Sequence, residues 1–151
     1  MRLENKVAVV TGAGQTAGIT VGNGRATALL FARHGAKVML VDKDDTSLKE
    51  TSELIKSEGG ECLTHSMDVT DAPACLEMIK ICQALFGRVD ILHNNVGIGA
   101  GDRGVTHLTE ENWDRIMDVN LKSMFLTAKY AIPVMREQQA GVVINISSVA
   151  A

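Results

Sequence analysis

The sequence predicts an α/β fold, a doubly wound parallel sheet with helices on both faces. Two observations lead to this prediction. Short apolar runs alternate along the chain with longer segments in which apolar residues recur at helical spacing. Glycines or polar residues follow each apolar run, as expected where buried strands end in loops. Units of this kind have right-handed crossovers, and a chain of 151 residues suits one domain over residues 1–151.

The predicted strands are the five apolar runs, at residues 6–11, 36–41, 61–67, 89–93 and 142–146. The first run is nearly continuous, which is typical of a central strand that is covered on both faces. The predicted helices cover residues 25–34, 46–57, 73–86 and 109–137. Gly35 is placed to end the first helix and Asp71 to cap the third. Thr109 and Asn112 are cap candidates for the long fourth helix, in which Pro133 marks a kink or the final turns.

A glycine-rich stretch joins the first strand to the first helix, with glycines at positions 12, 14, 18, 22 and 24. Such a turn lets backbone N–H groups and a helix N-terminus face an anion at close range, and dinucleotide pyrophosphate is the commonest such anion. The spacing is about six residues longer than the G-x-G-x-x-G pattern. The stretch is therefore either a dinucleotide-binding turn or an ordinary flexible loop, and residues 15–21 either border a cofactor or bulge into solvent.

Asp42 ends the second strand, a little under 20 residues after the last glycine of the turn. An acid at this position can accept hydrogen bonds from a ribose and repel a 2′-phosphate; the alternative is a solvated turn acid, since Asp44 and Asp45 follow. Ligands of parallel sheets bind at the carboxyl ends of the strands. Five strand ends converge on that edge, contributing residues 12–24, 42, 68, 94–97 and 147–148.

The long helix has an apolar stripe that begins at Trp113, Ile116 and Met117 and contains one polar residue, Asn120. A polar side chain that faces the core costs about 1–3 kcal/mol unless it is hydrogen-bonded, so Asn120 needs a partner or a function.

Composition excludes several classes of function. A net charge of −3 and an aromatic content of 3% argue against a nucleic-acid partner. The first residues lack the apolar core of a signal peptide, and no apolar run reaches the length of a membrane span, so we expect a cytoplasmic protein. The three cysteines form no C-x-x-C pair and are expected in the core, and the four histidines lack ligand spacing, so no metal site is expected.

With these residues assembled, the chain resembles the N-terminal part of a short-chain dehydrogenase/reductase over essentially all of its length. The family's Thr-Gly-x-x-x-Gly-x-Gly turn corresponds to Thr11, Gly12, Gly22 and Gly24. Its Asn-Asn-Ala-Gly motif corresponds to residues 94–97, where valine replaces alanine. Its helix asparagine matches Asn120, and its strand-five serine matches Ser148.

The resemblance implies a Rossmann fold with strand order 3-2-1-4-5 that is incomplete on its C-terminal side. It implies catalytic roles for Ser148, which would polarise the substrate oxygen, and for Asn120, which would hold a relay water. The family's catalytic Tyr-x-x-x-Lys is missing, because Tyr130 has Val134 four positions on. The motif would follow beyond Ala151, so we expect a truncated chain that is inactive by itself. The implied cofactor-binding residues are Gly12, Gln15, Gly22, Asn23, Gly24, Asp42, Lys43, Asp68, Val69, Asn94, Val96, Gly97, Val119, Ile146 and Ser147.

The function expected from the resemblance is hydride transfer between a nicotinamide cofactor and a small-molecule alcohol or carbonyl substrate. Asp42 favours NAD over NADP, although Lys43 follows it directly. Family members commonly pair through the long helix, which implies a homo-oligomer, either a dimer or a tetramer. Two alternatives stay open: a non-catalytic nucleotide-binding module, and a methyltransferase that uses S-adenosylmethionine, a class that also has a glycine turn after strand one and an acid after strand two.

Overall fold

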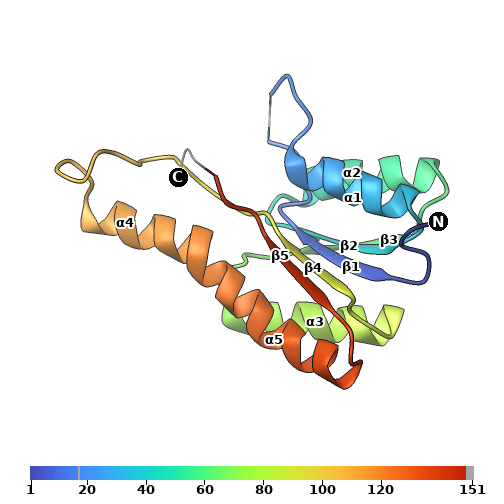
Figure 1. The fold of residues 1–151 in the computed structure, drawn as a ribbon. Coiled ribbons are helices and arrows are strands. Elements are labelled where there is room, and N and C mark those ends of the chain that lie inside the picture. The colour runs from blue at the N-terminus through green and yellow to red at the C-terminus, as the bar shows by residue number, and fades with distance from the viewer. Residues whose placement is uncertain (17, 149–151) are drawn as a thin grey trace.

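The computed structural model describes residues 1–16 and 18–148, and these form a sheet covered by helices on both faces (Figure 1). The strands are β1 (Val7–Thr11), β2 (Lys37–Asp42), β3 (Cys62–Ser66), β4 (Ile91–Asn94) and β5 (Val142–Asn145). All four neighbouring pairs are parallel, and the strand order is β3-β2-β1-β4-β5. The predicted fold class and order are therefore confirmed.

Two helices cover one face of the sheet, and two others cover the opposite face (Figure 1). The first pair is α1 (Asn23–Arg33) and α2 (Asp45–Ser57). The opposite layer contains α3 (Ala72–Phe86) and α5 (Ser123–Glu137). The helix α4 (Glu110–Met117) and the π-helical turn η1 (Asp118–Lys122) precede α5 and have no buried residue among those that the structure describes. The helices therefore divide the core into two layers that share the sheet.

Strand β1 lies at the centre and is buried along its whole length, as its continuous apolar sequence predicts. Successive side chains of a strand point to opposite faces. Val9 accordingly packs in the layer of α3 and α5 with Met78. Val10 packs in the layer of α1 and α2 with Ala28 and Leu48.

The predicted long helix is interrupted in the structure. Between α4 and α5 the backbone forms η1, a π-helical turn that contains Asn120. Turns of this kind occur mostly as single insertions in α-helices, often at functional sites. None of the described residues of α4 is buried, and Trp113 is 53% exposed, so the predicted apolar stripe does not face the core in this half. Pro133 lies inside α5, which continues to Glu137.

The predicted helix ends are partly confirmed. Thr109 caps α4, since its hydroxyl accepts a hydrogen bond from the N–H of Asn112 at 3.3 Å. Asp71 is the N-cap residue of α3, as predicted, although within the described structure its side chain makes no capping hydrogen bond. Gly35 has a φ of +93°, a conformation that favours glycine where the chain leaves α1.

The three cysteines are buried core residues, as predicted. Burial raises the pKa of Cys75 to about 11 and that of Cys82 to about 12, so neither thiol is a ready nucleophile at neutral pH. In the described ranges, no group of three or more His, Cys, Asp or Glu residues could hold a metal ion. The described helices are all too short or too polar to cross a membrane.

Candidate functional site

A cleft of about 1010 Å³ lies at the carboxyl edge of the sheet, where parallel sheets bind ligands. This volume is at the upper end of the range for ligand pockets, so the cleft suits an extended ligand. Its lining includes eleven of the residues predicted to bind a cofactor. They are Gly12, Gly22, Asn23, Gly24, Asp42, Lys43, Asp68, Val69, Val96, Gly97 and Val119.

At two positions of the turn, the backbone conformation or the packing allows only glycine. Gly12 has a φ of +66°, which disfavours a side chain. A Cβ atom on Gly24 would lie 1.8 Å from the carbonyl oxygen of Gly12, so α1 approaches the turn too closely for any other residue. A Cβ atom on Gly22 would meet its nearest neighbour, Gln15 Oε1, at an ordinary 3.5 Å. The protein therefore demands glycine at positions 12 and 24 but tolerates a methyl group at position 22.

The N-terminus of α1 opens onto this cleft. Gly22 is the N-cap residue, and Asn23 and Gly24 form the first helical positions, all three in the cleft lining. The N-terminal end of a helix carries a partial positive charge and attracts anions. The side chain of Arg25, in the same turn, is directed to α2, where its guanidinium contacts Glu50 at 2.8 Å and Thr51 at 2.9 Å. At the glycine turn the helix end, and not the charge of Arg25, is therefore the feature that attracts an anion.

Two carboxylates line the cleft. Asp42 accepts hydrogen bonds from the backbone N–H groups of Gly14 at 3.0 Å and Asp44 at 3.2 Å. Asp68 accepts bonds from the N–H and the hydroxyl of Thr70 through its Oδ1 atom. These two bonds, together with the charge of Lys43, hold the pKa of Asp68 below its usual value although burial opposes them. Asp68 is therefore an ionised acceptor at neutral pH.

The structure distinguishes the two asparagines that follow β4. Asn94 is 2% exposed and does not line the cleft: its side chain donates to Asn145 at 2.9 Å and accepts from Thr127 at 2.8 Å. Asn95 lines the cleft instead. Its N–H donates to the Thr11 hydroxyl and its side chain donates to the Gly12 carbonyl, so these bonds hold it beside the glycine turn. The structure therefore places Asn94 between strands and helix, and Asn95 at the glycine turn.

Asn120 has a hydrogen-bond partner, as expected for a polar side chain on the apolar face of a helix. Its Oδ1 accepts from the N–H of Ile98 at 2.8 Å, and its Nδ2 donates to the carbonyl of Ile98 at 2.9 Å. The two bonds fasten the loop after Gly97 to η1. Asn120 itself is not in the cleft lining, whereas its neighbour Val119 and its partner Ile98 are.

Other predicted residues lie away from the lining. The side chain of Gln15 hydrogen-bonds to the backbone of Thr16, Thr20 and Gly22. Ile146, Ser147 and Ser148 follow β5 and are exposed, and the N–H of Ile146 bonds to the Asn94 carbonyl. The structure therefore does not bring Asn120 and Ser148 together in the cleft.

Sequence reasoning missed several lining residues, including Ile98, Arg115 and Asp118. Arg115 hydrogen-bonds to the carbonyl of Ala100 and so fastens the outer part of the same loop. A signal for Arg115 was present, because residues four apart share one helix face and Val119 was predicted to bind a cofactor. For Asp118 no comparable signal exists.

The sheet, the glycine-lined helix end and the strand-end acids together define a dinucleotide-binding α/β fold. The family model described as short chain dehydrogenase matches residues 6–151. This chain therefore belongs to the short-chain dehydrogenase family.

Individual relatives agree with this assignment. An oxidoreductase of uncharacterised function from Thermotoga maritima is 41% identical over 98% of this chain and 55% of its own length. A Burkholderia xenovorans structure described as a short-chain dehydrogenase/reductase superimposes with a TM-score of 0.92 at 43% identity, over 97% of this chain and 57% of its own. NAD⁺-bound xylitol dehydrogenase gives a TM-score of 0.90 at 28% identity, over 99% of this chain and 55% of its own. This chain thus spans little more than half the length of these proteins.

Proposed function

We propose that this chain is the NAD-binding portion of an oxidoreductase that acts on a small alcohol or carbonyl substrate. When bound, the nicotinamide would accept or supply the hydride. The observation that supports the proposal best is the convergence, in one cleft, of a helix end without room for a side chain at Gly24 and an acid at Asp42. The first suits a pyrophosphate and the second suits a ribose.

The chemistry of the lining suggests how the cofactor would lie. Gly12 and Gly24 let the backbone approach the pyrophosphate, while Asp42 would accept hydrogen bonds from the ribose of the adenosine half. Asp68 is an ionised acceptor that matches the exocyclic amine of adenine. Val96 and Val119 offer apolar surfaces in the same cleft. The pyrophosphate, the adenosine ribose and the adenine therefore each have a chemically matched group.

The preference for NAD rests on Asp42. A carboxylate in contact with the ribose repels a 2′-phosphate, and the NAD⁺-bound structural neighbour supports the same choice. Lys43 also lines the cleft and is the group that would favour NADP. We propose that Asp42 dominates, because backbone N–H groups of Gly14 and Asp44 orient its carboxylate.

For the reaction, we propose that Ser148 polarises the substrate oxygen and that Asn120 acts by positioning the loop at Ile98. The 151 residues contain no Tyr-x-x-x-Lys motif to move the proton. The relatives reported above are oxidoreductases or members of their family, so the methyltransferase alternative has no support.

For the whole protein we propose a homo-oligomer that pairs through the long helix. Three large apolar side chains on α4, η1 and α5 are more than half exposed, namely Trp113, Leu121 and Phe125. Exposed apolar residues gathered on one segment are typical of protein–protein contacts. A monomer in sedimentation at micromolar concentration would contradict this proposal.

The cofactor proposal can be tested by titrating NAD⁺ and NADP⁺ against the chain and two variants. We expect the chain to bind NAD⁺ more tightly by about tenfold, or about 1.4 kcal/mol. Asp42→Ala should bring the two affinities within about twofold of each other, because the repulsion is lost. Asp45→Ala removes an exposed charge three positions away and should leave the ratio unchanged. An unchanged ratio in Asp42→Ala would contradict the role of Asp42, and binding of neither nucleotide would contradict the proposed function.

A further inference from the structure

We propose that Gln15 is a positioning residue that closes the base of a six-residue insert, residues 16–21, and thereby keeps the glycine turn in its cofactor-binding shape. The inference rests on the proposed function of the cleft. Removing residues 16–21 from the sequence leaves Thr11, Gly12, Ala13, Gly14, Gln15, Gly22, Asn23 and Gly24, which is Thr-Gly-x-x-x-Gly-x-Gly. The insert therefore interrupts an otherwise regular turn between Gln15 and Gly22.

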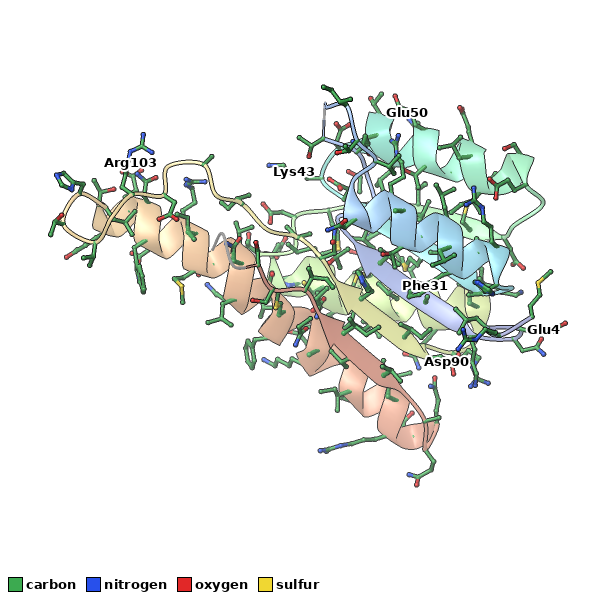
Figure 2. All side chains as sticks on the ribbon, turned by 45° about the horizontal axis from the view of Figure 1, so that its top comes forward. Glu4, Phe31, Lys43, Glu50, Asp90 and Arg103 are labelled. Carbon is green, nitrogen blue, oxygen red and sulfur yellow. The ribbon has the colours of Figure 1, made fainter. Side chains whose placement is uncertain are left out.

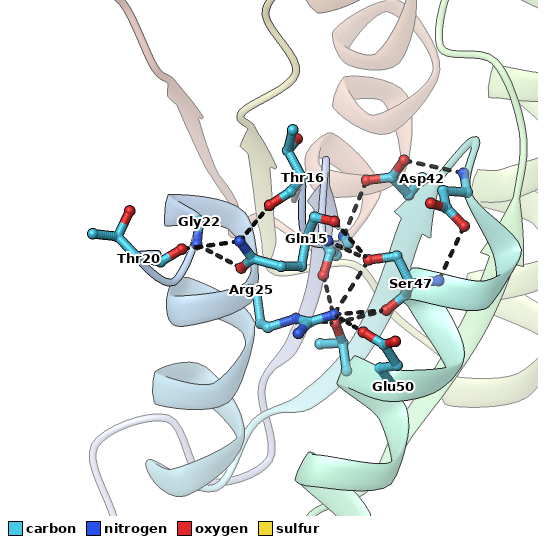
Figure 3. A network of polar contacts seen from close by, with 12 residues as sticks. Gln15, Thr16, Thr20, Gly22, Arg25, Asp42, Ser47 and Glu50 are labelled. Carbon is cyan, nitrogen blue, oxygen red and sulfur yellow. Dashed lines mark hydrogen bonds and ion pairs between the residues drawn. The ribbon is translucent and has the colours of Figure 1, made fainter. Parts of the chain in front are cut away.

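The side chain of Gln15 connects both ends of this insert (Figure 3). Its Oε1 accepts a hydrogen bond from the N–H of Gly22 at 2.7 Å. Its Nε2 donates to the carbonyls of Thr16 at 2.7 Å and Thr20 at 2.9 Å. One amide group thus bonds to the first residue of the insert, to a residue near its end and to the residue that follows it.

The two ends of the insert also lie close together. A Cβ atom built on Gly22 would be 4.0 Å from the carbonyl oxygen of Gly14. The chain therefore returns to the point it left, and Gly22 occupies the N-cap of α1 despite six additional residues. Without such a closure, the conformational freedom of the insert would be transmitted to the helix end that faces the cleft.

Gln15 can act in this way because its own backbone is fixed to α2. Its N–H donates to the hydroxyl of Ser47, and that hydroxyl donates to the Gln15 carbonyl at 3.2 Å. Ser47 is held in turn, since its N–H donates to Asp44 and its carbonyl accepts from Arg25 at 3.1 Å. Figure 3 shows this network running from the insert to Glu50. Because the Gln15 backbone is fixed, its side-chain amide has a defined position and can restrain the loop through its three hydrogen bonds.

The contacts of Gln15 distinguish positioning from direct binding. The side chain bonds only to the loop and to Gly22 within the described part of the chain, and Gln15 is absent from the cleft lining. Thr16 is the one described insert residue in that lining. Gln15 should consequently matter for NAD⁺ binding only while the insert is present.

A double-mutant cycle tests this dependence. Gln15→Ala is made in the 151-residue chain and again in a variant that lacks residues 16–21. Thr20→Ala is the control, because Thr20 is exposed, lies outside the cleft lining and accepts the Gln15 bond through its backbone carbonyl. In the chain with the insert, Gln15→Ala should raise the Kd for NAD⁺ by about tenfold, as expected for the loss of three hydrogen bonds. In the deletion background the same substitution should change the Kd by less than about twofold. Thr20→Ala should change the Kd by less than about twofold in the chain with the insert.

A readout that needs no cofactor accompanies the cycle, namely hydrogen exchange of the Gly22 N–H. Exchange should accelerate by about tenfold in Gln15→Ala, because the amide loses its acceptor. Gln15→Glu retains an acceptor oxygen and should restore slow exchange.

The possible failures are distinguishable. If Gln15→Ala weakens NAD⁺ binding equally with and without the insert, Gln15 contacts the cofactor and the inference is overturned. If the deletion variant does not fold, or if the chain does not bind NAD⁺ at all, the exchange rate of the Gly22 N–H still tests whether Gln15 restrains the insert. Unchanged exchange in Gln15→Ala would overturn the inference, whereas absent NAD⁺ binding alone would count against the proposed function.

Discussion

Both ends of the sheet carry carboxylates, but the carboxylates at the two ends have different hydrogen-bond and ion-pair partners. At the amino end Asp90 is 5% exposed and accepts two hydrogen bonds from Arg88 at 2.6 Å and one from the N–H of Val7 at 2.9 Å. Lys6 stands 3.7 Å away. At the carboxyl end Asp42 and Asp68 line the cleft. Figure 2 shows the separation, with Asp90 and Lys43 at opposite ends of the strands.

This difference separates a structural carboxylate from carboxylates that suit ligand binding. Asp90 is surrounded by two cations and a buried amide, so its charge is matched within the protein. Among the described residues, Asp42 and Asp68 form no ion pair and are held by backbone amides and a hydroxyl. A carboxylate oriented by neutral donors in an open cleft keeps capacity for the donors of a ligand. The partners of an acid, more than its burial, therefore indicate its role.

The largest effect is expected at the carboxyl end, for Gly24→Ala. Alanine normally stabilises a helix relative to glycine. Here the Cβ atom would overlap the Gly12 carbonyl, so the free energy of unfolding should fall by about 3 kcal/mol. Affinity for NAD⁺ should fall by about 100-fold, since the turn must shift. Chemical denaturation and NAD⁺ titration measure the two effects.

Gly22→Ala is the matched control, because the same methyl group two positions earlier meets no atom within 3.4 Å. Its free energy of unfolding should change by less than about 1 kcal/mol. Equal destabilisation by the two substitutions would show that the close approach at Gly24 is not the cause.

An intermediate effect is expected at the amino end, for Asp90→Asn. Burial alone would raise the pKa of Asp90, but the hydrogen bonds from Arg88 and Val7 and the charges of Arg88 and Lys6 outweigh it and hold the pKa below its usual value. The free energy of unfolding should fall by about 2 kcal/mol at pH 7, and the loss should vanish in acid as Asp90 itself becomes protonated. NAD⁺ affinity should change less than about twofold, since Asp90 is remote from the cleft.

Glu61→Gln provides the control at the same end of the sheet. Glu61 pairs with Lys37 at 3.0 Å, with both side chains about half exposed. Removing an exposed pair of this kind should cost less than about 0.5 kcal/mol. If Asp90→Asn weakened NAD⁺ binding as strongly as Gly24→Ala, the proposed division between the two ends would be wrong.

The smallest effect concerns His93 on β4. It is 5% exposed and packs edge-on against Phe31. Its Nδ1 is the one buried side-chain nitrogen or oxygen among the described residues that has no hydrogen-bond partner. Burial lowers the pKa of His93, so the unfolded chain takes up a proton before the folded protein does. The free energy of unfolding should therefore fall by about 1 kcal/mol as the pH drops from 7 to 5.5.

The matching variant is His93→Leu, which removes the titrating group. Denaturation at pH 7 and 5.5 should show a smaller pH-dependent loss for this variant than for the unaltered chain. An equal loss in both would assign the pH dependence to other groups.

The fold could be predicted because its signals are local. The apolar runs gave five strands and their helices, and the motif resemblance gave the strand order. The interruption at η1 was missed because the apolar residues in the range 113–135 recur at the spacing of an uninterrupted α-helix.

The site was predicted less completely because its geometry depends on distant partners. Asn94 and Asn95 are adjacent and identical in type, and the hydroxyl of Thr127, 33 residues later, fixes Asn94 in the interior. The path of the insert depends on the bonds of the Gln15 amide to backbone groups, which have no sequence signature. Spacing alone could identify the cleft but not these contacts.

The central claim is that the carboxyl end of the sheet binds a nicotinamide dinucleotide and the amino end does not. The most direct measurement is a titration of the ¹⁵N-labelled chain with NAD⁺, followed through backbone amide shifts. We predict saturable shifts for Gly12, Gly24, Val69 and Gly97, with Val7 and Asp90 unchanged. Saturable shifts centred on Val7 and Asp90, or no saturable shifts at the four cleft amides, would contradict the claim.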